Sequence, residues 1–136
     1  AALARCFDLT VRSVELVDYI SDLYEDITTG DDNLLLVGLA HRFGLNAYEL
    51  PANEWRSPNI AHALLSNGLF DWAEENAVSC FTRARDLASN HALTDLADLL
   101  QKRIDAAAQV KDREQLLCTE LVDTAMKLFA NRPQQP

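Results

Sequence analysis

The stretch DWAEENAVSCFTRARDLA, residues 71–88, decides the fold of this chain. Its small and apolar residues recur at three- and four-residue steps, which places them on one face of an α-helix. Small residues let a second helix approach closely, so we expect this face to pack against another helix of the same domain. Arg83, Arg85 and Asp86 fall outside it and are expected to face water. The packing face consists of Ala77, Phe81, Ala84, Leu87 and Ala88.

A second amphipathic helix is predicted near the start of the chain. Apolar residues between positions 16 and 27 repeat with the same helical spacing. The segment CFDLT at residues 6–10 precedes them, and Asp8 or Thr10 is of the type that caps a helix. Gly30 in the following TTGDDN segment is expected to end this helix.

Two shorter helices are expected in the middle of the chain, at residues 34–43 and 60–66. Asp31 or Asp32 is placed to cap the first of them. A Ser-Pro pair at 57–58 precedes the second, and this pair is typical of an N-cap followed by the first helical residue.

A long segment near the end of the chain has no helix-breaking residue, because neither Gly nor Pro occurs in residues 69–132. One very long helix is therefore an alternative there. However, the apolar stripe over residues 93–108 lapses in the polar segment 109–115 before it resumes. We predict two helices with a turn near Lys111 and Asp112.

These segments predict an all-α fold with about six helices, packed as antiparallel hairpins in a helical bundle or a short α-solenoid. No strand-like alternation persists over four or more residues. A length of 136 residues with 49% hydrophobic residues suits one domain with a sizeable core. We expect residues 1–130 to form this single domain and residues 131–136 to be a flexible tail.

The formal net charge of -9 limits the classes of partner. Nucleic acids and anionic membrane surfaces attract basic patches, and no segment supplies one, so neither partner is expected. Residues 13–82 hold 12 acidic and only 2 basic residues. This acidic surface either serves solubility or favours a partner protein with a basic surface. Asp22 and Asp26, on the acidic side of the first helix, are candidate residues for binding such a partner.

The cysteines Cys6, Cys80 and Cys118 are odd in number and widely spaced. This pattern argues against a disulfide framework, and no CxxC pair is present to bind zinc. Buried free thiols are typical of a reducing compartment. Because the chain also has no membrane-spanning apolar run and no signal-peptide pattern, we expect an intracellular, cytoplasmic protein.

Sequence motifs of the common enzyme classes are missing, among them glycine-rich phosphate loops, GxSxG, HExxH and the EF-hand loop. We therefore assign no catalytic residue, no metal ligand and no cofactor, and an enzyme is not the favoured interpretation. One alternative is a ligand or metal site in which His41 and His62 converge with Glu54. In the other interpretation, each histidine occupies a partly exposed helix position.

The best candidate region for function is residues 43–72, which hold five of the ten aromatic residues. Its irregular part, residues 45–58, suits binding because loops on a rigid scaffold often carry functional residues. Tyr, Trp and Arg are also enriched at interface hot spots. The aromatics either bind a partner or fill a corner of the core. The candidate protein-binding residues of this region are Tyr48, Glu54, Trp55 and Arg56.

The pattern A-x-x-x-F-x-x-A-x-x-L at residues 77–87 resembles the second helix of a tetratricopeptide repeat. A related pattern, C-x-x-x-V-x-x-A-x-x-L, begins 41 residues later at Cys118, whereas the typical repeat period is about 34 residues. The Trp-Leu-Gly-Tyr set of the family is missing, and the first 60 residues do not fit. The resemblance covers roughly residues 60–130 and implies a helical-hairpin scaffold that binds proteins. It implies no catalytic residue.

Three functions follow from these observations. The favoured hypothesis is a non-enzymatic helical protein–protein interaction module, part of a scaffold or adaptor. The first alternative is a self-associating structural or assembly subunit, which an exposed apolar stripe on the last helix would support. The second alternative is a ligand- or metal-binding helical domain.

Overall fold

A computed structural model describes residues 1–43 and 52–132 of the chain. Within these ranges the chain forms six α-helices and no strand, which confirms the predicted all-α fold. None of the described helices is both long enough and apolar enough to cross a membrane. The helices are α1 (Ala2–Ser21), α2 (Leu23–Thr29), α3 (Leu34–Phe43), α4 (Arg56–Ser66), α5 (Leu69–Asn90) and α6 (Thr94–Ala130).

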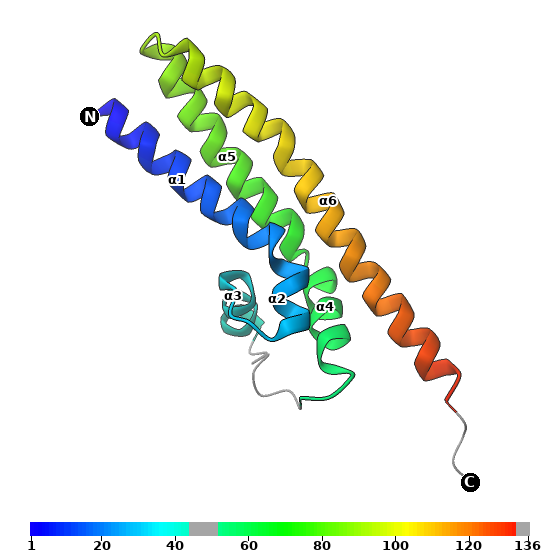
Figure 1. Cartoon of the computed structure of the whole chain (residues 1–136). Helices are drawn as coiled ribbons and strands as arrows, with labels where there is room; N and C mark the ends of the chain where they lie inside the picture. Colours follow the sequence, from blue (N-terminus) through cyan, green and yellow to red (C-terminus); the bar gives the residue numbers. More distant parts are fainter. Residues whose placement is uncertain (44–51, 133–136) are drawn as a thin grey trace.

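Three long helices, α1, α5 and α6, lie side by side along the molecule (Figure 1). The central helix is α5, which runs antiparallel to both α1 and α6 and packs against each of them. The short helices α2, α3 and α4 gather where α1 ends and α5 begins. The start of α1 and the end of α6 therefore lie at opposite ends of an elongated molecule.

The predicted packing face of α5 is buried except at Leu87, which is partly buried. Ala77, Phe81, Ala84 and Ala88 are at most 1% exposed. The alanines bring the backbones so close that the thiol of Cys6 on α1 donates a hydrogen bond to the carbonyl oxygen of Ala84, at 3.3 Å. Phe81 fills the space between the three long helices. Its buried neighbours in this cluster are Cys6, Leu9, Ala84, Ala88, Ala97 and Leu100.

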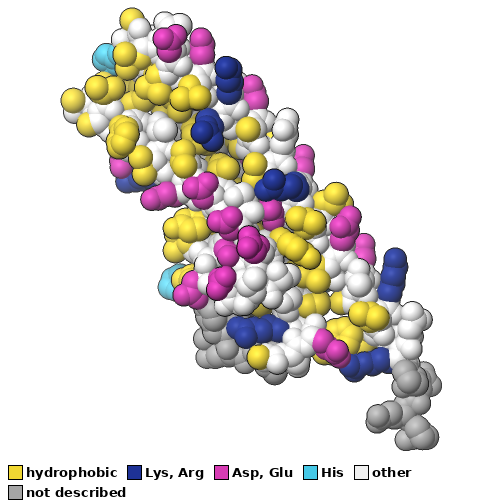
Figure 2. Space-filling view, viewed as in Figure 1, with side chains coloured by type: hydrophobic (Ala, Val, Ile, Leu, Met, Phe, Trp, Pro, Cys, Tyr) yellow, Lys and Arg dark blue, Asp and Glu magenta, His cyan; other side chains and the backbone are white. Residues whose placement is uncertain are grey.

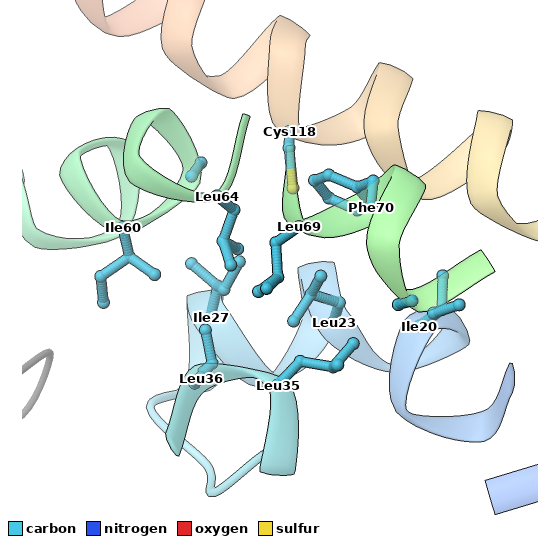
Figure 3. Packing of buried hydrophobic residues seen from close by; sticks show 12 residues of the cluster. Ile20, Leu23, Ile27, Leu35, Leu36, Ile60, Leu64, Leu69, Phe70 and Cys118 are labelled. Carbon is cyan, nitrogen blue, oxygen red and sulfur yellow. The ribbon is translucent and has the colours of Figure 1, made fainter. Parts of the chain in front are cut away.

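A second cluster of buried residues holds the short helices in place (Figure 3). All six helices contribute to it, and Cys118 of α6 points toward Phe70 at the start of α5. Helices as short as α2 are unstable alone, so they depend on this burial. Its labelled members are Ile20, Leu23, Ile27, Leu35, Leu36, Ile60, Leu64, Leu69, Phe70 and Cys118.

The first predicted helix differs from the prediction at its start and in its continuity. It begins at Ala2 instead of after CFDLT, because Cys6 already lies on its buried face. Thr10 does not cap a helix, since its hydroxyl donates to the carbonyl oxygen of Cys6 one turn earlier, at 2.8 Å. The predicted single helix also divides at Asp22 into α1 and α2.

The last helix is unbroken, so the predicted turn near Lys111 and Asp112 is wrong. The polar residues that interrupt its apolar stripe stay in the helix because they have partners there. Lys111 Nζ lies 3.2 Å from carboxylate oxygens of both Asp71 and Glu74 on α5. The division of the first helix and the continuity of the last leave the expected number of helices at six.

The helix boundaries in the middle of the chain are set by other residues than those predicted. Asn33, not Asp31 or Asp32, caps α3, because its Oδ1 accepts a hydrogen bond from the backbone amide of Leu35 at 2.9 Å. Helix α4 begins before the expected Ser-Pro pair, at Arg56. The predicted stop at Gly30 is confirmed, since this glycine ends α2 with a left-handed φ of 80°.

Candidate protein-binding groove

An open apolar groove lies where the start of α4 meets the end of α6. Two adjoining hollows of about 480 and 470 Å³ form it. Both hollows are lined by Trp55 and Pro58 from α4 and its N-cap and by Ala125 from α6. Thr28 of α2 adds to the second hollow. We call this region the α4–α6 groove; Figure 2 shows apolar and charged side chains intermixed toward this end of the molecule.

The inner face of α6 loses its cover toward the C-terminus. Cys118 is completely buried, and Val122 and Ala125 in the following turns are partly buried. Leu128 and Phe129 continue the same helical spacing but are 62% and 68% exposed. In Figure 1 the last turns of α6 project beyond α4. An apolar stripe with core-like spacing therefore remains uncovered in the described part of the chain.

Trp55 is held by contacts with the end of α6. Its ring meets the ring of Phe129 edge to face, with centroids 6.1 Å apart and planes at 83°. The guanidinium of Arg132 lies 4.9 Å from the Trp55 ring centroid, and Arg132 Nη2 is 2.6 Å from Glu54 Oε1. Edge-to-face aromatic pairs and cation–π contacts are attractive. They fix the orientation of the indole at the edge of the groove.

The structure brings together only some of the predicted binding residues. Glu54 and Trp55 lie side by side at the groove, and Arg56 is the partly buried first residue of α4. Asp22 is the residue between α1 and α2. Asp26 accepts a hydrogen bond from Asn33 Nδ2 at 2.8 Å, which gives it a structural role. Tyr48 lies outside the described residues.

The aromatic residues of segment 43–72 do not form one group. Phe70 is a core residue, only 3% exposed. Trp72 is 43% exposed and lines a different groove of about 420 Å³, together with Leu34 and Val37 of α3. Phe70 is therefore part of the core, whereas Trp55 and Trp72 line two different grooves.

The sequence predicts the groove residues of α6 only as part of the apolar stripe of the last helix, and it leaves open whether that stripe is exposed. Phe129 and Leu128 fit that stripe by their spacing, and the same spacing does not reveal that their side chains are uncovered. Arg132 was placed in the expected tail, yet it contacts Trp55 and Glu54. The sequence signal for the α6 side of this site is an apolar stripe that continues to the very end of a Gly- and Pro-free segment.

Charged side chains lie in the groove and near it. Glu25, one turn before Thr28 on α2, is exposed, and Glu54 is exposed beside Trp55. Acidic side chains also gather over the middle of the face shown in Figure 2. The basic residue of the groove, Arg132, is already paired with Glu54. Glu54 and Arg132 therefore compensate each other's charge, and the acidic excess lies in the surrounding part of the chain, since residues 13–82 hold 12 acidic and 2 basic residues.

Two charged residues stand on the inner face of α6 away from the groove. Burial of the Lys111 ammonium acts against its charge, but hydrogen bonds to Asp71, Glu74 and Asp112 outweigh it and raise the pKa of Lys111. The Glu114 side chain is only 4% exposed. Burial raises the pKa of Glu114, although the hydrogen bond from the Tyr24 amide works in the opposite direction.

Neither metal ligands nor reactive thiols converge at the groove. Within residues 1–43 and 52–132, no three His, Cys, Asp or Glu side chains are placed to hold a metal ion. His62 lines the α4–α6 groove, whereas His41 lines the groove at Trp72. The three cysteines are free. Burial, with a smaller effect of nearby Glu114, raises the pKa of Cys118 to about 12, so this thiol is not a nucleophile at neutral pH.

Comparison of the chain with protein-family models, with curated proteins and with solved structures finds no match. The tetratricopeptide resemblance stays an expectation.

Proposed function

We propose that the chain is a non-enzymatic protein–protein interaction module of the scaffold or adaptor type, and that it binds an amphipathic helix of a partner protein in the α4–α6 groove. The observation that carries the proposal is the uncovered apolar stripe of α6 beside Trp55. The tetratricopeptide resemblance, which implies a protein-binding scaffold, points to the same class of function. Free cysteines fit the reducing interior of a cell, where we propose that this module acts.

A helix suits the groove because of the spacing of its apolar residues. The buried part of α6 packs against α5 with residues three and four apart, and Val122, Ala125 and Phe129 continue that spacing. An amphipathic helix placed there would extend the helix packing of the domain. Burying exposed apolar surface contributes about 25 cal/mol per Å², and a fixed tryptophan is a favoured hot spot.

The charges at the groove favour basic residues on the flank of the partner helix. Glu25 is exposed one turn before Thr28, which lines the groove, and residues 13–82 are strongly acidic. Opposite charge steers association and suppresses wrong partners. The proposed partner therefore combines an apolar face with basic flanking residues.

Designed helical peptides test the proposal. One labelled peptide combines leucine with lysine and the other leucine with glutamate, and fluorescence anisotropy measures their binding. We expect saturable binding of the leucine–lysine helix, weakened about tenfold or more by Trp55→Ala or Phe129→Ala. Leu99→Ala is the matched control, because Leu99 is also exposed on α6 but far from the groove. Equal losses in Phe129→Ala and Leu99→Ala would contradict the site.

Self-association is the second candidate, because the uncovered stripe on the last helix could also receive a second copy of the chain. Sedimentation velocity over a wide concentration range distinguishes the two. A monomer at all concentrations supports a separate partner protein. A concentration-dependent dimer that Phe129→Glu abolishes would instead assign the stripe to self-association.

A further inference from the structure

A buried carboxylate interrupts the backbone hydrogen bonding between α1 and α2. Only Asp22 separates the two helices, and residues 2–29 contain neither Gly nor Pro. In a continuous helix the amide of Tyr24 would donate to the carbonyl oxygen of Ile20. Here the amide donates to Oε2 of Glu114 on α6, at 3.1 Å. The chain changes direction between α1 and α2 (Figure 1), and a side chain inserted into the helical ladder is one of the few causes of such a bend.

We propose that Glu114 is a latch that holds the bend between α1 and α2 and so positions α2 beneath the α4–α6 groove. The carboxylate suits this role because it is buried and because both of its oxygens are engaged. Its Oε1 accepts a hydrogen bond from Arg113 Nη2 at 3.3 Å. A charged acceptor forms a stronger hydrogen bond to a backbone amide than a neutral one does.

The bend turns α2 into the core and toward α4. Leu23 and Ile27 of α2 point into the cluster around Leu64 (Figure 3). The carbonyl oxygen of Ile27 accepts a hydrogen bond from the Ser57 hydroxyl of α4, at 3.1 Å. A continuous chain of contacts thus leads from Glu114 through α2 to the first turn of α4, next to Trp55.

The bend itself is independent of the proposed function. Its importance for the groove rests on the proposed function, in which the groove binds a partner helix. If Glu114 holds α2, and α2 holds the start of α4, loss of the latch loosens Trp55. The long helices would remain packed around Phe81, because their cluster contains no residue of α2 or α4.

Hydrogen exchange of individual amides tests the latch in the full chain. The variants are Glu114→Ala and Glu114→Gln, and the matched control is Glu120→Gln, an exposed glutamate on the same helix. We expect the Tyr24 amide to exchange about tenfold faster or more in Glu114→Ala than in the control. Glu114→Gln should lie between them because it keeps a neutral acceptor. If Glu114→Ala does not fold, the Tyr24 exchange rate in Glu114→Gln, compared with that in the control, still tests the latch.

Two results would overturn the latch. One is a Tyr24 exchange rate that is the same in the Glu114 variants and in the control. The other is an equal loss of protection at Phe81, which would mean general destabilisation.

Trp55 fluorescence tests the connection to the groove in a Trp72→Phe background, where Trp55 is the only tryptophan. We expect Glu114→Ala to shift the Trp55 emission to longer wavelength. Unchanged emission together with faster Tyr24 exchange would refute the connection. Absence of peptide binding with a normal Tyr24 rate would contradict the proposed function and leave the latch intact.

Discussion

At the scale of single residues, burial of the Glu114 carboxyl makes the free energy of unfolding depend on pH. Its pKa in the folded chain is raised above the ordinary value of 4.5. The folded state therefore holds the proton more tightly than the unfolded state does. As a result, the contribution of this carboxylate to the free energy of unfolding falls as the pH rises above about 4.5 and recovers as the pH is lowered toward it.

Glu114→Gln removes this titration. We expect the stability of the wild-type chain relative to Glu114→Gln to increase as the pH is lowered from about 7 to about 4.5. Urea denaturation of both proteins at several pH values measures the difference, and Glu120→Gln serves as the control. A difference that stays constant with pH, or that changes in the opposite direction, would contradict the raised pKa.

Phe81 and Phe129 offer a matched comparison of the same side chain inside and outside the core. Phe81 is 1% exposed between three helices, whereas Phe129 is 68% exposed. Phe81→Ala should lower the free energy of unfolding by about 3 to 5 kcal/mol because it leaves a cavity. Phe129→Ala should cost about 1 kcal/mol or less, mainly its contact with Trp55. Chemical denaturation measures both, and similar costs would mean that the end of α6 is covered.

At the scale of elements, the continuity of α6 can be tested with proline. Asp112 lies in the middle of α6, where proline removes a helical hydrogen bond and clashes with the preceding turn. Asp112→Pro should therefore cost about 3 kcal/mol or more. Thr94→Pro is the control, because Thr94 is the first residue of α6, a position that accepts proline. If α6 had a turn near Lys111, thermal unfolding would show Asp112→Pro to be as harmless as Thr94→Pro.

Helices could be predicted from the sequence where a local apolar pattern defines them. The helix boundaries that were predicted wrongly depend on residues far away in the sequence. Lys111 looks like a turn residue until its ion pairs with Asp71 and Glu74 are known, and these lie about 40 residues earlier. In the proposed latch, the bend at Asp22 depends on Glu114. This residue accepts its hydrogen bond from the Tyr24 amide, 90 positions earlier in the sequence. No local periodicity carries such information.

The candidate site was predictable in part for the same reason. Trp55 and Glu54 were found because aromatic residues are concentrated in an irregular segment. Phe129 and Arg132 were not assigned to the site, since only the folded chain shows that α6 extends beyond the helices that cover its inner face.

At the scale of the whole molecule, two core clusters share the three long helices. One cluster surrounds Phe81, and the other holds the short helices near Leu64. Because α1, α5 and α6 contribute to both, we expect the clusters to unfold together in one transition. The alternative is an independent subdomain made of the short helices, which would melt by itself.

A substitution in one cluster, with unfolding measured at the other, distinguishes these possibilities. In the Trp72→Phe background, Trp55 fluorescence reports on the end with the short helices, and far-ultraviolet circular dichroism reports on all helices. Phe81→Ala should lower the denaturation midpoint equally by both methods, because the shared helices transmit the loss. A Trp55 midpoint that stays at the wild-type value while the circular dichroism midpoint falls would show that the two ends of the molecule unfold separately.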